Sequence, residues 1–257
     1  MNRIISVITV VYNDVSNIEA TIQNVLMQDY AGIEYIVIDG GSTDGTVDVI
    51  RRYSGKIRYW VSEKDRGIYD AMNKGIKEVS GEYAIFMNSG DKFFNPAVIS
   101  SIFNKDIIWA NKPAVIYGNT CIKHGPHEVL KEVSKEPDIF NAMPFCHQSV
   151  FISAVHLKKY LFNLDFKIIA DREMITRMFV DKCGFHQVKE VISIIQGEGY
   201  SNLSRYKFQK EENRMLMNLQ QISPRRARIS EKKAWIKDLL ANFIPDKLIQ
   251  YKRKYKT

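Results

Sequence analysis

The sequence predicts a doubly wound α/β fold with a mixed, mostly parallel, Rossmann-like sheet, followed by a C-terminal helical tail. Apolar, β-branched segments alternate with helical segments over roughly the first 90 residues, which is typical of right-handed βαβ units. The strand-like segments are apolar throughout, as expected of strands covered on both faces. The 257 residues suffice for one large domain with an appendage.

Four segments are predicted to be buried strands of the sheet. Each is almost wholly apolar and stops at a cluster of polar residues. They are Ile4–Val11, Ile33–Asp39, Ile57–Ser62 and Tyr83–Met87.

The segment after the first strand is predicted to be a helix. Ile18, Ile22, Val25 and Leu26 share one helical face, and Ser16 with Glu19 fits a capping box. A second clear helix precedes the fourth strand, and its inward residues are Ile68, Met72, Ile76 and Val79.

Beyond Pro96 the pattern loosens. Residues 114–118 and 120–123 resemble two short strands. A strand-like piece is expected to end at Asp171, where a helix begins. Its inward residues are predicted to be Met174, Ile175, Met178 and Phe179.

The charge and cysteine content limit the class of protein. Residues 221–257 hold 11 Lys and Arg against three acidic residues, so this tail accounts for the whole net charge of +8. Cys121, Cys146 and Cys183 are odd in number and have no metal-like spacing, which indicates free thiols in a reducing compartment. The N-terminus has the pattern of a strand rather than a signal peptide, and no apolar run approaches the roughly 20 residues that span a bilayer. We therefore expect a cytoplasmic protein.

Polar side chains follow each of the four predicted strands. They lie in residues 12–14, at Asp39, in residues 63–66 and in residues 88–91. One such cluster is explained by an Asx turn or a helix cap. Four at the same edge favour a ligand site, because open α/β sheets bind ligands beyond the carboxyl ends of their strands. No Gly-x-Gly-x-x-Gly follows the first strand and no Walker loop occurs, which disfavours dinucleotide and P-loop sites.

Four stretches resemble family-two glycosyltransferases of the GT-A fold: SVITVVYN, YIVIDGGSTDGT, DRGIYDAMNKGI and GEYAIFMNSGD. The resemblance covers residues 3–95 and continues more faintly through HQS and IIADREM. It implies a GT-A domain over residues 1–205, with a nucleotide-binding half (1–95) and an acceptor half (96–205). The basic helical tail, residues 206–257, lies outside it.

The resemblance implies a divalent cation, Mg²⁺ or Mn²⁺, held by an Asp-x-Asp-type motif after the fourth strand. Such a cation neutralises the charge that grows on a departing diphosphate. In the matching stretch Asn88 replaces the first carboxylate, which leaves Asp91 as the expected metal ligand. Asn88 is expected either to contribute an amide oxygen to the metal site or to contact the donor sugar, and Ser89 is expected to contact the donor. The alternative is an Asx turn that ends the strand.

Several residues are implied to bind the nucleotide. Asp39 matches the family's nucleoside contact, although Gly40 replaces a second aspartate that often addresses the base. Tyr12 and Asn13 resemble the first nucleotide-binding turn. The alternatives are a core edge for Tyr12 and a satisfied turn for Asn13.

A second group follows the third strand. Arg66 suits a phosphate or base, and Asp65 suits the nucleoside or the donor sugar. Asn73 is expected on the same side of the next helix as Asp70, which is alternatively a cap of that helix.

Asp171 is the predicted catalytic base. Inverting members of the family use one carboxylate to deprotonate the acceptor hydroxyl, and Asp at a helix N-cap is the alternative.

His147 and Gln148 match a pair found near the donor sugar or acceptor in part of the family, whereas a lone His is more often structural. Residues 196–205 are interpreted as a mobile loop over the donor, with Gly197 and Gly199 as hinges and Arg205 near the diphosphate.

The tail combines an apolar helical face with basic residues. That face is predicted to hold Trp235, Ile236, Leu239, Leu240 and Phe243. The combination favours a helix on an anionic membrane surface, where a lipid-linked acceptor would be found, and it equally fits packing on the body or a homodimer contact. We expect no nucleic-acid binding, because no recognition module occurs.

These expectations converge on an inverting, metal-dependent hexosyltransferase. It would move a sugar from a nucleotide sugar, with UDP-sugar favoured, to a saccharide or lipid-linked saccharide in surface polysaccharide or glycolipid biosynthesis. The alternative is a degenerate sugar-nucleotide-binding module, which the departures at Asn88 and Gly40 leave open.

Overall fold

The computed structural model describes residues 3–134, 139–140, 142–197 and 205–241. The chain divides into two compact units, residues 1–197 and 198–257, and each is described by itself. The division falls a few residues before the expected boundary after residue 205. Most of the predicted donor loop (198–204) lies outside the described residues, as does Phe243 in the tail.

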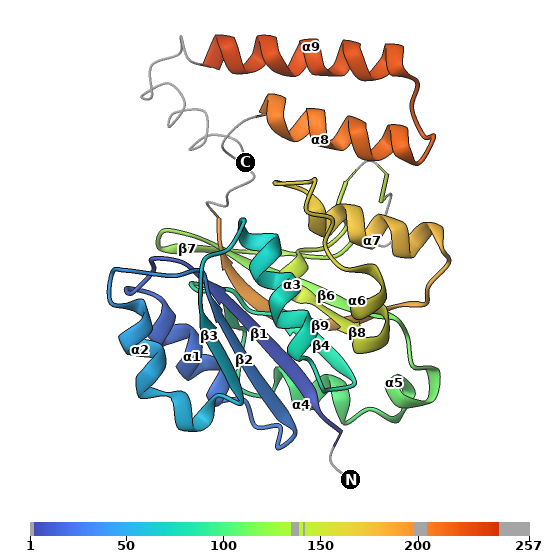
Figure 1. The fold of residues 1–257 in the computed structure, drawn as a ribbon. Helices are drawn as coiled ribbons and strands as arrows, with labels where there is room; N and C mark the ends of the chain where they lie inside the picture. Colours follow the sequence, from blue (N-terminus) through green and yellow to red (C-terminus); the bar gives the residue numbers. More distant parts are fainter. Residues whose placement is uncertain (1–2, 135–138, 141, 198–204, 242–257) are drawn as a thin grey trace. The chain divides into compact units, whose positions relative to one another are not determined.

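The first unit alternates strands and helices as predicted (Figure 1). Each of the four predicted strands begins and ends within two residues of its expected bounds. The elements are β1 (Ile5–Val11), α1 (Ile18–Leu26), β2 (Ile33–Asp39), α2 (Thr46–Arg52), η1 (Ser54–Lys56), β3 (Tyr59–Ser62), α3 (Ile68–Glu78), β4 (Tyr83–Phe86), β5 (Lys92–Phe93), α4 (Val98–Phe103), α5 (Asp106–Asn111), β6 (Val115–His124), β7 (His127–Lys131), η2 (His147–Ser149), β8 (Val150–Ser153), α6 (Ala154–Tyr160), α7 (Ala170–Val180) and β9 (Phe185–Gln196).

One mixed sheet holds the nine strands of the described residues, in the order β3-β2-β1-β4-β8-β6-β9-β5, with β7 beside β6. Strands β1 to β4 pair in parallel, and β8 is antiparallel to both β4 and β6. The chain runs from β1 outward to β2 and β3 and then returns to the other side of β1 as β4. Ligands bind at such a switch point in open α/β sheets.

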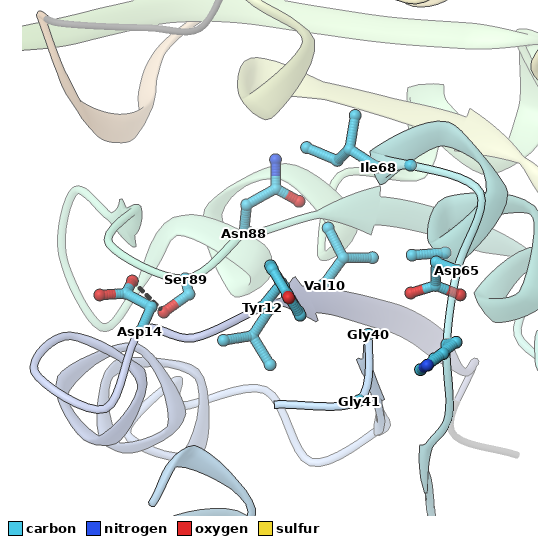
Figure 2. Close-up of a pocket in the computed structure, with 13 residues that line it drawn as sticks. Val10, Tyr12, Asp14, Gly40, Gly41, Asp65, Ile68, Asn88 and Ser89 are labelled. Carbon is cyan, nitrogen blue, oxygen red and sulfur yellow. Dashed lines mark hydrogen bonds between the residues drawn. The ribbon is translucent and has the colours of Figure 1, made fainter. Parts of the chain in front are cut away.

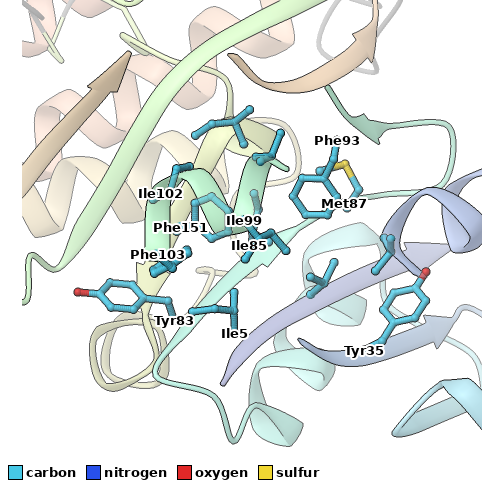
Figure 3. Close-up of a cluster of buried hydrophobic side chains, with 14 of the residues drawn as sticks. Ile5, Tyr35, Tyr83, Ile85, Met87, Phe93, Ile99, Ile102, Phe103 and Phe151 are labelled. Atoms are coloured by element: carbon cyan, nitrogen blue, oxygen red, sulfur yellow. The ribbon is translucent and has the colours of Figure 1, made fainter. Parts of the chain in front are cut away.

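Both faces of the parallel strands are covered, which explains their unbroken apolar sequence. Ile5 and Ile85 pack on one face in a buried cluster with Phe103 of α4 (Figure 3). On the other face, a Cβ at Gly75 of α3 would lie 2.6 Å from Ile8 Cγ2. A glycine at this position therefore lets α3 lie close against β1.

Four local predictions are wrong. Ile68, at the start of α3, is 45% exposed rather than inward. Helix α1 buries Ile18, Ile22 and Val25 as expected, but its N-cap is Asn17 and no side chain caps it, so the capping box is absent. The residues just before Asp171 form no strand. Phe179 is 43% exposed rather than inward.

The two short strands predicted over residues 114–123 are one strand, β6, with an irregular register near Gly118. A Cβ at Gly118 would lie 2.7 Å from the backbone oxygen of Glu190 in β9. The close approach of two backbones at this irregularity explains the glycine that made the sequence look like two segments.

The second unit is described over a helical hairpin, α8 (Arg205–Asn218) and α9 (Pro224–Ala241). The Asp238 carboxylate accepts hydrogen bonds from the backbone N–H groups of Arg205 and Tyr206 (3.3 and 2.9 Å), which satisfies the start of α8. No helix in the described part of the chain is both long enough and apolar enough to cross a bilayer.

Candidate functional site

A cavity of about 620 Å³ lies at the carboxyl ends of β1, β2 and β4 and at the start of α3, where the polar strand ends predicted a ligand site (Figure 2). It is lined by Val10, Val11, Tyr12, Asp14, Gly40, Gly41, Lys64, Asp65, Gly67, Ile68, Ala71, Asn88 and Ser89.

The first polar turn divides into a cavity residue and a structural residue. Tyr12 lines the cavity and is 66% exposed, so its ring is free to face a flat ligand group. Asn13 has a left-handed φ of +48°. Its Oδ1 accepts the backbone N–H of Thr43 at 2.9 Å, and its own N–H donates to Ser42 Oγ at 2.7 Å. The structure therefore places Asn13 in a satisfied turn and away from the lining.

Asp39, which is expected to contact the nucleoside, is fully buried and is not among the residues that line the cavity. Its Oδ2 accepts the N–H groups of Gly41 and Ser42 at 3.0 and 2.9 Å and the hydroxyl of Ser62 at 2.6 Å. Its Oδ1 accepts the Ser42 hydroxyl at 2.5 Å. These bonds hold the segment after β2 in the shape that places Gly40 and Gly41 at the cavity.

The glycine at position 40 has a steric reason. A Cβ there would lie 3.0 Å from Asp65 Oδ2 and 3.2 Å from Tyr12 Cδ2. Gly40 thus makes room for two cavity side chains that arrive from neighbouring strand ends (Figure 2). An aspartate would crowd both of them.

Asp65 lines the cavity and is paired from behind. Lys74 Nζ lies 2.5 Å from Asp65 Oδ1 and 2.8 Å from Glu63 Oε1. Burial raises the pKa of Asp65, although the hydrogen bond and charge of Lys74 oppose that rise.

Arg66 is not among the lining residues. Its guanidinium pairs with Asp70 at 3.1 Å, and its side chain is 77% exposed. Asp70 also accepts the Arg66 N–H at 3.0 Å, just before α3 begins. Asp70 therefore acts as the helix-start residue that was the alternative in the sequence.

Asn73 is not among the residues that line the cavity. Its Nδ2 donates to the backbone oxygen of Phe162 at 2.8 Å, and its Oδ1 accepts the N–H of Phe162 at 2.9 Å. This two-bond clip joins α3 to the segment that leads into α7.

The stretch after β4 brings Asn88 and Ser89 to the lining of the cavity. Ser89 donates to Asp14 Oδ2 at 2.7 Å. Asp14 and Lys64 lie in predicted polar strand ends but had no assigned role, and both line the cavity. A hydrophilic residue one position from a turn gives no signal of the direction in which its side chain points.

Asp91 is buried next to the cavity and does not line it. It is 7% exposed, and its Oδ2 accepts Gln148 Nε2 at 3.1 Å. Burial raises the pKa of Asp91 to about 6, against the charge of His147 and the Gln148 hydrogen bond. The surroundings of the Asp91 carboxylate therefore do not fully compensate its negative charge.

The residues present fit a divalent cation with few protein ligands. No group of three or more His, Cys, Asp and Glu suited to a metal occurs in the described part of the chain. However, Asn88 Oδ1 is buried and has no hydrogen-bond partner among the described residues. It belongs to the same turn as Asp91, whose N–H donates to the Asn88 backbone oxygen at 2.9 Å. One carboxylate and one amide oxygen leave further oxygen ligands to be supplied by a diphosphate.

His147 connects the metal-motif stretch to the predicted base. Its Nδ1 lies 3.3 Å from Asp171 Oδ2, and its Nε2 lies 3.3 Å from Asn88 Nδ2. Burial lowers the pKa of His147, but the hydrogen bond to Asp171 and the charges of Asp171 and Asp91 raise it overall.

Asp171 lies at the start of α7 and is held from two sides. Besides His147, the Tyr69 hydroxyl lies 3.2 Å from its Oδ1 and also donates to the Ile168 oxygen at 2.8 Å. Burial raises the pKa of Asp171, but the His147 hydrogen bond and charge, the Arg172 N–H and the Tyr69 hydroxyl lower it overall. The carboxylate is thus ionised at neutral pH.

The short helix η2 that carries His147 and Gln148 is anchored by buried hydroxyls. Ser149 Oγ lies 2.7 Å from both Thr120 Oγ1 of β6 and Ser193 Oγ of β9. Two predicted site residues are therefore fixed by a network that no local sequence pattern reveals. Asp91, Gln148, His147 and Asp171 meet in one region although 80 residues separate Asp91 from Asp171 in the chain.

Comparisons with known proteins bear on the family and the fold of this chain. Residues 6–142 match the family model described as glycosyl transferase family 2. A relative from Mycobacterium tuberculosis, named an uncharacterized glycosyltransferase, is 34% identical over 183 residues, which cover 67% of this chain and 68% of that protein. A glycosyltransferase of Mycobacterium bovis named for PGL/p-HBAD biosynthesis is 23% identical over 184 residues, 68% of this chain and 69% of the relative.

Solved structures share the fold. TarS of S. aureus in complex with UDP superposes with a TM-score of 0.67 at 19% identity, and the match covers 83% of this chain and 64% of the TarS chain. The mannosyltransferase PcManGT from Pyrobaculum calidifontis, in complex with GDP-Man and Mn²⁺, gives a TM-score of 0.63 at 19% identity and covers 91% and 70% of the two chains. With the family match and the α/β sheet described above, these findings identify the chain as a member of glycosyltransferase family 2 with the GT-A fold.

Proposed function

We propose that the protein is an inverting glycosyltransferase that uses a UDP-sugar and passes the sugar to a hydroxyl of a saccharide or lipid-linked saccharide. The observation that carries the proposal is that the Asp91 and Asp171 carboxylates are linked through two adjacent residues. Asp91 is bonded to Gln148, and the adjacent His147 is bonded to Asp171, beside a cavity large enough for a nucleotide. UDP is favoured because TarS is solved with UDP and with UDP-GlcNAc.

In the proposed reaction Asp171 accepts the proton of the acceptor hydroxyl. The acceptor oxygen forms a bond to the anomeric carbon of the sugar while the bond from that carbon to the diphosphate oxygen breaks, so UDP leaves with the bonding electrons. His147 and Tyr69 hold the Asp171 carboxylate in a fixed direction during the transfer.

The donor is held by the cavity. Tyr12 lines the cavity and would stack on the base, and Asp65 and Lys64 line the wall where the nucleoside would lie. Asp91 and Asn88 Oδ1 are the residues that would hold Mg²⁺ or Mn²⁺, and the cation would neutralise the charge on the departing diphosphate. Asp39, Asn13 and Asn73 shape the site without touching the donor.

The cellular location and the pathway are part of the same proposal. The three cysteines are free thiols in the structure, in keeping with a reducing, cytoplasmic location. A role in surface polysaccharide or glycolipid assembly is in line with the relative named for PGL/p-HBAD biosynthesis.

The test is a donor screen. UDP-, GDP- and dTDP-sugars are incubated with the protein and Mn²⁺, and sugar release is measured with and without a chelator. We expect release from a UDP-sugar that stops with the chelator and is lost in Asp91→Ala. Tight UDP binding without release or transfer to any acceptor would instead identify a degenerate binding module. Equal activity of Asp91→Ala would remove the role of Asp91.

A further inference from the structure

Helix α9 packs against α8 through small and polar side chains. Ala227 and Ala234 are 2% and 7% exposed and lie two helical turns apart. Asn213 of α8 donates to Glu231 Oε1 at 3.1 Å, and Ser230 donates to Asn213 Oδ1 at 3.0 Å. The described contacts of α9 with α8 are thus made by small and polar side chains.

Four large apolar residues of α9 lie on the exposed side of the helix. Ile229, Trp235, Ile236 and Leu239 are 50%, 51%, 39% and 43% exposed. At 3.6 residues per turn, Ile229, Ile236 and Leu239 fall opposite the buried alanines, with Trp235 at the margin. Large apolar side chains that are exposed together on one side of a helix present a surface for a partner.

The charges of α9 are sorted in the same way. Its cationic residues are all exposed: Arg225, Arg226, Arg228, Lys232, Lys233 and Lys237. Its acids Glu231 and Asp238 are half-buried and accept hydrogen bonds from α8. The exposed side of α9 therefore combines apolar side chains with positive charge, and the sequence adds four more Lys and Arg within residues 252–256.

We propose that this exposed side of α9 docks on an anionic phospholipid surface. Its apolar side chains would enter the boundary between headgroups and acyl chains, and its Arg and Lys side chains would reach lipid phosphates. Tryptophan suits that boundary because its ring is apolar and its N–H is polar. The proposal deepens the proposed function by placing the enzyme where a lipid-linked acceptor is found, but lipid docking itself does not depend on catalysis.

The experiment measures binding of the full-length protein to vesicles by flotation. We expect binding to vesicles of phosphatidylcholine with phosphatidylglycerol and little binding to phosphatidylcholine alone, with a steep loss as salt is raised. Of the tryptophans, Trp109 is buried and Trp60 is half-buried, whereas Trp235 is exposed. A blue shift of the Trp235 fluorescence on anionic vesicles therefore reports insertion directly.

Two variants and a matched control test the surface. Lys232→Gln/Lys233→Gln should weaken vesicle binding roughly fivefold for each cation removed. Trp235→Ala/Ile236→Ala should weaken it at all salt concentrations. The control Lys56→Gln/Lys77→Gln removes the same charge from exposed positions of the first unit and should leave binding unchanged.

Several results would overturn the proposal. These are equal binding to neutral and anionic vesicles, equal weakening by the control pair, and loss of a dimer in light scattering when Trp235 and Ile236 are replaced. Salt-dependent binding to RNA but not to vesicles, or a lower Tm of the Trp235→Ala/Ile236→Ala variant with no vesicle binding by the wild type, would also overturn it. If the protein turns over a UDP-sugar but does not bind vesicles, only the docking proposal fails. If it binds vesicles but turns over no UDP-sugar, only the proposed function fails.

Discussion

At the scale of single residues, Asp91 carries the negative charge that the proposed cation would balance. It is a buried carboxylate with one side-chain hydrogen-bond donor, and burial raises its pKa to about 6. The folded protein therefore binds a proton at Asp91 more tightly than the unfolded chain does. Between the unfolded and folded pKa values, stability falls as pH rises, because the native state must then hold an uncompensated charge.

We predict that Asp91→Asn stabilises the cation-free protein at neutral pH. The gain should be absent near pH 4 and should grow to at most ~3 kcal/mol above pH 7, since each pKa unit corresponds to about 1.4 kcal/mol. Urea unfolding of both proteins over this pH range, with chelator present, measures the difference. A constant difference across the range would contradict the assigned pKa, and Mn²⁺ with UDP should stabilise the wild type more than the variant.

A second residue-scale prediction concerns Gly40. Restoring the family's aspartate by Gly40→Asp should weaken UDP binding roughly tenfold or more, because its Cβ would crowd Asp65 and Tyr12. Calorimetry of UDP binding gives the result, and Gly55→Asp is the control because a Cβ at Gly55 meets nothing within 4 Å. Tighter UDP binding by Gly40→Asp would show that the position still addresses the base.

At the scale of elements, the site depends on segments that are fastened to the sheet and to one another. Helix η2 is held by the Ser149 hydroxyl, and the segment leading into α7 is held by the Asn73 clip. Both fastenings place the groups that hold Asp171. Their residues support the site from behind and do not contact the cavity.

We predict that Asn73→Ala costs about 1–3 kcal/mol of unfolding free energy, since two backbone groups of Phe162 lose their partner. The KM for the donor should stay within about twofold while kcat falls, because Asp171 is less well positioned. Steady-state kinetics and urea unfolding test this. A large rise in donor KM with unchanged stability would instead indicate that Asn73 contacts the donor.

The elements show what the sequence could and could not predict. The four strands, α1 and α3 follow from apolar periodicity, and their polar ends predicted the edge at which the cavity lies. The roles of Asn13, Asp39 and Asn73 were not predictable, because a polar side chain at a turn satisfies either the backbone or a ligand. The meeting of His147 with Asn88 and Asp171 depends on pairing between β4 and β8, which are far apart in the chain.

At the scale of the whole molecule, the end of the sheet opposite the cavity is held by Glu34. Its carboxylate accepts hydrogen bonds from Ser6 and Ser80 and pairs with Arg58 at 2.9 Å. It therefore ties β1 and β2 to the turn between α3 and β4. Burial raises the pKa of Glu34, but these partners lower it overall.

We predict that Glu34 stabilises the fold above its unfolded pKa and that this contribution is lost as pH falls through its lower folded pKa. Glu34→Gln should cost about 2 kcal/mol at pH 7 and little in acid. Thermal unfolding as a function of pH measures this, and Glu82→Gln is the control because Glu82 is exposed. If both variants lower the thermal stability equally at each pH, the hydrogen bonds and ion pair of Glu34 do not contribute more stability than an exposed glutamate does.

The central claim is that Asp171 accepts the proton from the acceptor in a site that holds the donor by other residues. The direct measurement compares UDP-sugar affinity and transfer rate in the wild type and Asp171→Asn. The account predicts a Kd for the UDP-sugar within about twofold of the wild type and a transfer rate lower by roughly 10²–10⁴. A variant that transfers sugar at the wild-type rate, or that loses donor affinity together with rate, would contradict it.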